Sequence, residues 1–348
     1  MKRLFFTCGF FFVFLFCTSQ NQGKKSYVIN TIAFYNLENL FDTIDNPSKK
    51  DEYSPMLQMK TNKSEAYWSK IDNMSRVLSE IGKEKTGKTA SVIGICEIEN
   101  SAILDDLLNS SYFKNQPYDY IHQESPDWRG IDVALIYNTT LFSPSDYKTY
   151  ELKAWNDKGY RVKTRSQLLV SGYLDGELIH LIINHWPSQR SGKDKTAYLR
   201  KLSAELTLNI IEEIERDHPN SKTIIMGDFN DNPTNNSIKK ILKTASEKKK
   251  LKENQLYNPF EKMFKKGMGT LGFRDNINLF DQLIITSNLV TNNYKEYQFY
   301  KAGIFNPTYL TTKKGRYKGY PFRSFSNNQF NGGFSDHYPV YIYLIREK

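Results

Sequence analysis

The stretch TIIMGDFND, residues 223–231, joins an apolar strand pattern to a cluster of polar residues. The run before Gly227 predicts a strand that is buried on both faces, and Gly227 permits a tight turn at its end. Asp228 and Asn230 would then lie beyond the carboxyl end of the strand, where ligands bind in layered α/β folds. Because Asp and Asn after a strand often only form the turn, the stretch predicts a site only if other polar residues reach the same edge.

Polar residues occur at the ends of five other apolar segments that have strand character. These residues are Asn36 after segment 28–35, Glu97 after 91–96, Asn184 and His185 after 178–183, Asp281 within 279–285, and Asp336 with His337 before 340–345. Two further segments, 68–81 and 196–216, carry apolar side chains at helical spacing. Strands that alternate with helices over short connections are typical of a layered α/β sheet, so the polar ends are expected to meet.

Two more charged residues lie in or beside strand patterns. Asp132 is the only acid in the apolar segment 131–137, and an acid in such a position needs a partner. Arg165 opens the segment 165–170. An arginine at the start of a strand is commonly a surface residue, and the alternative is a guanidinium directed at a phosphate.

The 348-residue sequence contains 48 Lys and Arg residues against 38 Asp and Glu residues, a net charge of +10. This excess favours an anionic partner: nucleic acid, a phosphorylated compound or a membrane surface. Segment 239–252 is rich in lysine and predicts a solvated face, with a nucleic-acid or lipid-headgroup contact as the alternative. Segment 313–323 interleaves basic and aromatic residues, which suits phosphates and bases and equally an exposed hairpin.

The N-terminus has the pattern of an export signal. Lys2 and Arg3 precede the apolar residues 4–17, a run too short to span a membrane comfortably, so residues 1–17 predict a signal and 18–27 a polar tether. Residues 28–348 are expected to form a single domain. Cys17 is a candidate lipidation site, so the exported protein is either a cell-envelope lipoprotein or secreted. Beyond the signal only Cys96 remains, which excludes an internal disulfide.

The polar residues at the strand ends have the composition of a site for a hard cation. Carboxylate and amide oxygens with few nitrogens suit Mg²⁺ or Mn²⁺, which bind together with substrate phosphates. The sequence contains no serine nucleophile elbow. The chemistry that this set supports is metal-assisted attack of water on a phosphoester.

The ordered set of motifs resembles that of the endonuclease/exonuclease/phosphatase family. The motifs are Asn36-Leu-Glu, Glu97, Asn184-His185, Gly227-Asp-Phe-Asn230 and Ser335-Asp-His337, and they run from residue 31 to 345. The resemblance implies an α/β fold in which two packed mixed β-sheets, flanked by helices, form a four-layered sandwich. It also implies a catalytic domain over residues 28–348, and the signal would make the chain an exported bacterial member.

The resemblance implies that one set of residues binds the metal and another set acts on the attacking water. Asn36 and Glu97 would bind the divalent metal, Mg²⁺ or Mn²⁺, with Asp336 as a further ligand. Asp228 and Asn230 would orient or deprotonate the attacking water and stabilise the transition state.

The resemblance also assigns the two histidines and their partners. His337 would be a catalytic histidine, and Asp281 would fix its tautomer and favour its protonated form. His185 would contact a phosphate oxygen or the leaving group, with Asp132 as the candidate carboxylate that orients it. The implied phosphate-binding residues are Arg165 and Asn184.

Substrate choice stays open between two classes. Net basicity and segment 313–323 favour a metal-dependent nuclease that cleaves phosphodiesters. Export and the candidate anchor favour a phosphatase or phosphodiesterase that acts on small or lipid-borne phosphoesters. The expected partner is nucleic acid or another phosphoester; a membrane is contacted only through an N-terminal lipid anchor, and no obligate protein partner is implied.

Overall fold

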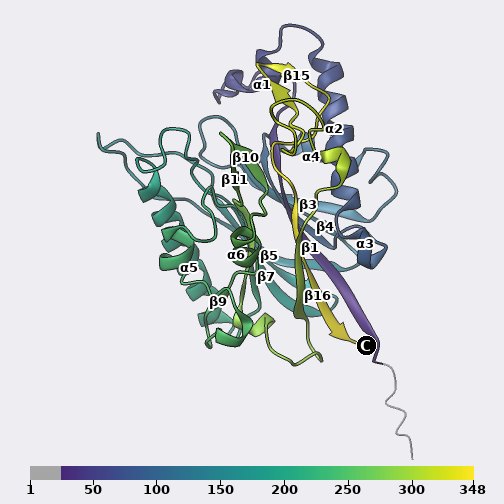
Figure 1. The fold of residues 1–348 in the computed structure, drawn as a ribbon, viewed down its shortest axis with the longest axis vertical. Helices are drawn as coiled ribbons and strands as arrows, with labels where there is room; N and C mark the ends of the chain where they lie inside the picture. The colour runs from purple at the N-terminus through teal and green to yellow at the C-terminus, as the bar shows by residue number, and fades with distance from the viewer. Residues whose placement is uncertain (1–24) are drawn as a thin grey trace, which may run out of the picture.

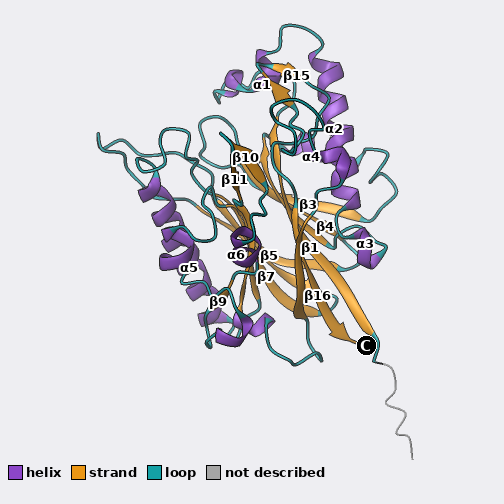
Figure 2. Ribbon diagram, in the orientation of Figure 1, coloured by secondary structure: helices purple, strands orange, loops and turns teal. Residues whose placement is uncertain are grey.

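The computed structural model describes residues 25–348, so the predicted signal and residues 18–24 of the predicted tether lie outside the described residues. Two six-stranded β-sheets pack face to face, and helices cover their outer surfaces (Figures 1 and 2). The prediction of an α/β sandwich with two packed mixed sheets is therefore confirmed. No helix within residues 25–348 is long and apolar enough to cross a membrane.

The first sheet has the strand order β13-β16-β1-β2-β4-β3. Its strands are β1 (Tyr27–Leu40), β2 (Val92–Ile98), β3 (Tyr118–His122), β4 (Asp132–Asn138), β13 (Gln298–Ile304) and β16 (Val340–Glu347). Only β1 and β2 are parallel, and the other pairs are antiparallel. The parallel pair brings the ends of β1 and β2, with their polar residues, to one edge of the sheet.

The second sheet has the order β5-β6-β7-β8-β12-β9. Its strands are β5 (Phe142–Tyr150), β6 (Gln167–Leu174), β7 (Glu177–His185), β8 (Thr223–Asp228), β9 (Leu256–Tyr257) and β12 (Asp281–Thr286). Here β7 and β8 form the parallel pair. Two small hairpins complete the strands: β10 (Leu271–Phe273) with β11 (Asn276–Asn278), and β14 (Phe325–Ser326) with β15 (Gln329–Phe330).

The two helices predicted from segments 68–81 and 196–216 are present, and they flank the sheets on opposite sides. The helices are α1 (Pro55–Gln58), α2 (Lys63–Glu80), α3 (Lys83–Thr86), α4 (Ser101–Leu108), α5 (Ala197–Asp217) and α6 (Phe260–Lys265). Short helical turns lie at η1 (Asp51–Tyr53), η2 (Ser237–Ile241), η3 (Lys248–Lys250), η4 (Ser287–Leu289) and η5 (Thr308–Leu310). Apolar residues of α2 and α4 pack on the first sheet and those of α5 on the second (Figure 1).

The main core lies between the two sheets. Alternate residues of the central strands point into it, including Phe34, Met226 and Leu283, and all three are fully buried. Gly94 lets the sheets approach closely, because a Cβ at this position would lie 2.5 Å from the Met226 sulfur. The strands that carry the polar ends are therefore fixed by buried apolar side chains.

Gly227 does not form the turn that the sequence predicts. It lies inside β8, and its missing side chain allows close strand pairing, since a Cβ would lie 2.4 Å from the backbone oxygen of Asn184. The turn comes later, at Asn230, whose φ is 49°. Glu97 also takes a positive φ, of 62°, where β2 ends. These left-handed residues redirect the chain and aim the adjacent side chains over the edge of the sheets.

Candidate active site

Asp228 lies at the centre of the polar edge. It is the last residue of β8, and it pairs in register with His185 of β7 on one side and with Asp281 of β12 on the other. Across the two sheets, its Oδ2 lies 3.2 Å from the amide nitrogen of Asn36. The same oxygen lies 4.0 Å from Nε2 of His337. Residues from four other segments of the chain therefore converge on one buried carboxylate, as the sequence pattern predicts.

Asn36 joins the two carboxylates of this edge. Its amide nitrogen donates to Glu97 Oε1 at 3.1 Å as well as to Asp228 Oδ2. Its amide oxygen accepts the backbone N–H of Glu38 at 2.9 Å. The structure thus brings Asn36 and Glu97 together, and it uses Asn36 to hold the carboxylates in place through its nitrogen.

The donor set fits a divalent cation. Glu97, His185 and Asp228 each offer one ligand atom, and these atoms all lie within 4.8 Å of one another. Burial raises the pKa of Asp228 to about 7; the nearby His337 opposes this rise, and the Asp281 and Glu97 carboxylates add to it. A bound cation would relieve this concentration of negative charge. Two carboxylates beside one imidazole can bind a divalent cation.

His337 is held by Asp281, as the family resemblance implies. The Asp281 carboxylate lies 2.7 Å from Nδ1 of His337, and both residues are buried. Burial opposes protonation of the ring, but the adjacent carboxylate outweighs it and raises the pKa of His337 well above its usual range. Ser335 fixes the backbone here, because its hydroxyl donates to the Asn36 carbonyl and accepts the N–H of His337.

His185 is the neutral histidine of the site. Its Nε2 lies 3.7 Å from Glu97 Oε1 and 3.7 Å from Asp228 Oδ2. Burial lowers its pKa well below the usual range, and the positive charge of Arg165 lowers it further. Its buried Nδ1 has no hydrogen-bond partner within residues 25–348. The two histidines of the site therefore differ in charge state near neutral pH.

The structure does not bring Asp132 to His185. The carboxylate of Asp132 lies 3.0 Å from Nε2 of His122 and accepts the backbone N–H of Ser125 at 2.8 Å. The physical reason is that Asp132 begins β4 and its carboxylate is taken up by His122, which ends the neighbouring strand β3. The expectation that this acid needs a partner holds, and the partner is a different histidine.

Arg165 and Asn184 support the end of β7 through hydrogen bonds. The Arg165 guanidinium donates to the backbone oxygens of His185 and Trp186 and pairs with Asp127 at 3.2 Å. The Asn184 amide donates to two backbone oxygens and accepts from the Trp186 indole at 3.0 Å. Neighbours in a strand point to opposite faces, so Asn184 points into the structure when His185 points into the site.

Asn230 and Asp336 lie at the edge of the site. The Asn230 backbone N–H donates to Asp228 Oδ1 at 2.9 Å, and its side chain donates to the Trp186 carbonyl at 3.0 Å. Asp336 forms an ion pair with Arg323 at 3.1 Å, and its other oxygen lies 3.9 Å from Nε2 of His337. Asp336 is not part of the group of ligand atoms that Glu97 forms with His185 and Asp228.

A buried charged cluster supports the site, and the sequence pattern did not reveal it. Lys70 of α2 is fully buried, and its ammonium donates to the Glu38 backbone oxygen and to the Ser324 hydroxyl. The Glu38 carboxylate accepts the Ser324 N–H at 2.6 Å and pairs with Arg323 at 3.1 Å. The available signal was Lys70 itself, a charge on the apolar face of a helix.

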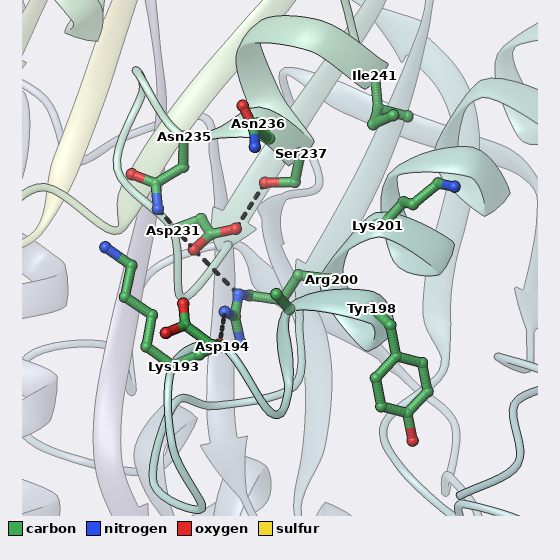
Figure 3. Close-up of a pocket in the computed structure, with 11 residues that line it drawn as sticks. Lys193, Asp194, Tyr198, Arg200, Lys201, Asp231, Asn235, Asn236, Ser237 and Ile241 are labelled. Carbon is green, nitrogen blue, oxygen red and sulfur yellow. Dashed lines mark hydrogen bonds and ion pairs between the residues drawn. The ribbon is translucent and has the colours of Figure 1, made fainter. Parts of the chain in front are cut away.

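A pocket lies behind the turn that follows Asn230, between the start of α5 and residues 231–241 (Figure 3). Its central feature is a buried ion pair in which Nε of Arg200 lies 3.0 Å from Asp231 Oδ1. The Ser237 hydroxyl donates to Asp231 Oδ2 at 2.7 Å, and the Asn235 amide donates to Oδ1 at 3.0 Å. Asp231 thus anchors the turn that positions Asn230.

The fold and the site together define a metal-dependent hydrolase of phosphoester bonds. The chain belongs to the endonuclease/exonuclease/phosphatase family, whose family model matches residues 31–346. No curated protein matches the chain in sequence.

Solved structures of this family share the fold. An endonuclease/exonuclease/phosphatase family protein from Bacteroides thetaiotaomicron is 15% identical, with a TM-score of 0.53, and the match covers 93% of this chain and 97% of that one. A mannosyl-6-phosphatase from the same organism is 17% identical, with a TM-score of 0.54 and coverages of 90% and 99%. TDP2 of D. rerio, complexed with a single strand DNA product, is 11% identical, with a TM-score of 0.51 and coverages of 91% and 98%.

Proposed function

We propose that this protein is a Mg²⁺-dependent nuclease, with Mn²⁺ as a substitute, that cleaves phosphodiester bonds of nucleic acid by attack of water. The observation that carries the proposal is the group formed by Glu97, His185 and Asp228 directly beside the Asp281–His337 pair. Net charge supports a polyanionic substrate, since the sequence carries +10.

The geometry supports a separate role for each side chain. Glu97, with Asp228 and His185 around it, would hold the cation, which supplies charge neutralisation at the phosphate and a more acidic water. The Asp228 carboxylate accepts the Asn230 N–H at Oδ1 and the Asn36 amide at Oδ2. Its Oδ2, which lies between His185 and His337, is placed to accept the proton of the attacking water. The protonated His337 would donate a hydrogen bond to the phosphate group as its charge increases.

A substrate panel tests this proposal. The purified protein is assayed with Mg²⁺ and with Mn²⁺ on single-stranded DNA, duplex DNA, RNA, inositol phosphates, mannose 6-phosphate and sphingomyelin, with His337→Ala as the inactive control. Cleavage of a nucleic acid that the control lacks supports the proposal. Hydrolysis of a small or lipid-borne phosphoester with all nucleic acids left intact would instead establish the alternative function, a phosphatase or phosphodiesterase.

We also propose that the protein is exported, on the basis of Lys2, Arg3 and the apolar residues 4–17. Fractionation of producing cells tests this proposal together with the role of Cys17. A lipid anchor is indicated if wild type is found with the membranes and the Cys17→Ala variant is found in the soluble fraction. Secretion is indicated if wild type and the variant are both found in the medium. Recovery of the full-length chain in the cytoplasm contradicts export.

A further inference from the structure

One exposed loop beside the site carries four basic side chains without acidic partners. The loop comprises residues 311–321, and its exposed basic residues are Lys313, Lys314, Arg316 and Lys318. Within residues 25–348, none of the four forms an ion pair. In the other basic segment, Lys239 pairs with Glu261 and Lys250 pairs with Glu247, whereas Lys240, Lys249 and Lys252 form no ion pair within the described residues. The loop therefore presents positive charge that the fold itself does not neutralise.

This loop is fixed next to the catalytic histidine. Thr311 and Pro321 pair across its base, and the backbone N–H of Thr312 donates to the Tyr320 oxygen at 2.8 Å. The Tyr338 hydroxyl lies 2.7 Å from the Thr311 hydroxyl. Tyr338 directly follows His337 in the chain. The basic loop is thus attached to the segment that positions the site.

The β10–β11 hairpin packs against the same loop. A Cβ on Gly272 of β10 would lie 2.4 Å from the Tyr320 ring, so the hairpin and the loop are in direct contact. At the base of the hairpin, the Thr270 carbonyl accepts the backbone N–H of Tyr338. The Thr270 hydroxyl accepts the backbone N–H of Asp281 at 3.5 Å. The hairpin and residues 311–321 together form one wall beside the Asp281–His337 pair, here termed the basic wall.

The basic wall also exposes aromatic rings next to its charges. Tyr317 and Phe273 are each 59% exposed, although such rings are usually buried. The Arg274 guanidinium lies 5.2 Å from the centre of the Phe273 ring, and that of Arg316 lies 6.0 Å from the centre of Tyr317. Charge and ring surface are therefore presented together to the solvent.

We infer that the basic wall binds a single-stranded segment of nucleic acid next to the scissile phosphodiester. This inference rests on the proposed nuclease function. Lysine and arginine side chains bind successive phosphates, and exposed rings stack on bases. A ring can stack on a base face only where the base is unpaired, so the combination favours a single strand over a duplex.

The test compares two triple variants that remove the same charge. One is Lys313→Ala/Lys314→Ala/Lys318→Ala in the basic wall; the other is Lys240→Ala/Lys249→Ala/Lys252→Ala, three exposed lysines outside the wall. With a single-stranded DNA oligonucleotide, kcat/KM of the wall variant should fall roughly 10-fold or more, and its salt dependence should become shallower by up to about 0.7 for each phosphate that is no longer neutralised. The control variant should retain wild-type values.

Two further measurements separate loss of nucleic-acid binding from loss of catalysis: hydrolysis of a small substrate, and a variant that lacks an exposed aromatic ring. Hydrolysis of bis(p-nitrophenyl) phosphate should be equal in wild type and both triple variants, because this substrate does not reach the basic wall. Tyr317→Ala should weaken binding of the single strand more than that of a duplex of the same sequence.

Three results would overturn the inference. The first is a wall variant that cleaves single-stranded DNA like the control variant while wild type is an active nuclease. The second is an equal effect of Tyr317→Ala on single strand and duplex. The third is binding of wild type to phosphatidylserine vesicles, abolished in the wall variant, with nucleic-acid cleavage unchanged, which would assign the wall to a membrane surface. A wild type that cleaves only small phosphoesters contradicts the proposed function itself and is recognised from the wild-type assays alone.

Discussion

Asp281 and His337 come from different sheets, and their side chains meet at 2.7 Å in the interior. Asp281 begins β12 of the second sheet, and His337 precedes β16 of the first. The contact fixes the ring so that Nδ1 faces the carboxylate and Nε2 faces Asp228. One pair therefore both positions a catalytic group and ties the two sheets together at the site.

Replacing Asp281 with Asn should lower kcat about 100-fold or more, because the carboxylate keeps His337 in the protonated form. The same carboxylate raises the pKa of His337. Its loss should therefore move the alkaline limb of the pH–kcat profile to lower pH. The profile is measured with bis(p-nitrophenyl) phosphate at saturating Mg²⁺. An unshifted alkaline limb would show that His337 does not act as an acid or hydrogen-bond donor in its charged form.

Replacing Glu97 with Gln should raise the half-saturating Mg²⁺ concentration roughly 10-fold or more, because one charged ligand becomes neutral. The matched control is Glu99→Gln, two residues further along. Glu99 accepts the backbone N–H of Asp42, and burial raises its pKa to about 8, so the neutral amide resembles its resting state. Mg²⁺ titrations of activity are compared. Equal titrations for the two variants would remove Glu97 from the metal site.

Replacing Lys70 with Met should reduce the free energy of unfolding by about 1 to 3 kcal/mol, because the Glu38 oxygen and the Ser324 hydroxyl lose their buried donor. The cluster also holds Arg323 and the segment before His337, so KM should rise. Urea unfolding and steady-state kinetics provide the measurements. Lys83→Met, at an exposed position, serves as the control. If Lys70→Met had the same free energy of unfolding as wild type, the buried ammonium would make no net contribution to stability.

The stability of the protein should fall as the solution becomes acidic, in part through His180. Burial, and then the charge of neighbouring His218, lowers the pKa of His180 to about 4. An unfolded histidine has a pKa of about 6.5, so the unfolded state binds more protons between these values. The contribution of His180 to the free energy of unfolding is complete above about pH 6.5. It is lost as the pH falls toward 4, and the loss amounts to at most about 3 kcal/mol.

Urea unfolding at pH 7 and pH 5 checks this expectation. His180→Gln should unfold with a smaller difference between the two pH values than wild type, because a neutral amide takes up no proton in either state. Identical pH dependence in the two proteins would contradict the assignment to His180.

The pattern of apolar segments with polar ends was enough to predict the layered fold and which residues meet at its edge. Asn36, Glu97 and Asp228 lie in the last part of central strands, and His337 lies shortly before β16, where burial constrains the sequence strongly. Their convergence follows from parallel pairing, β1 with β2 and β7 with β8. The local strand patterns and the pairing of the strands in the sheets agree at these positions, so the sequence alone is enough to predict them.

The partners of individual side chains could not be predicted in the same way. Asp132 pairs with His122 because β3 and β4 are neighbours, and neighbour relations between strands are not encoded in the local pattern. Asn184 follows the alternation of the strand and points away from the site. Lys70 reaches Ser324 across 254 positions of sequence. Such contacts depend on the packing of the whole fold.

The position of β16 sets the order in which the site can be completed. β16 is the last strand of the fold, yet it lies between β13 and β1 inside the first sheet. His337 lies three residues before the first residue of β16, and Figure 1 shows β16 running beside β1, the first strand. A nascent chain that still lacks this strand has an open sheet edge and no catalytic histidine. The candidate site is therefore incomplete until the last strand has paired with β1 and β13.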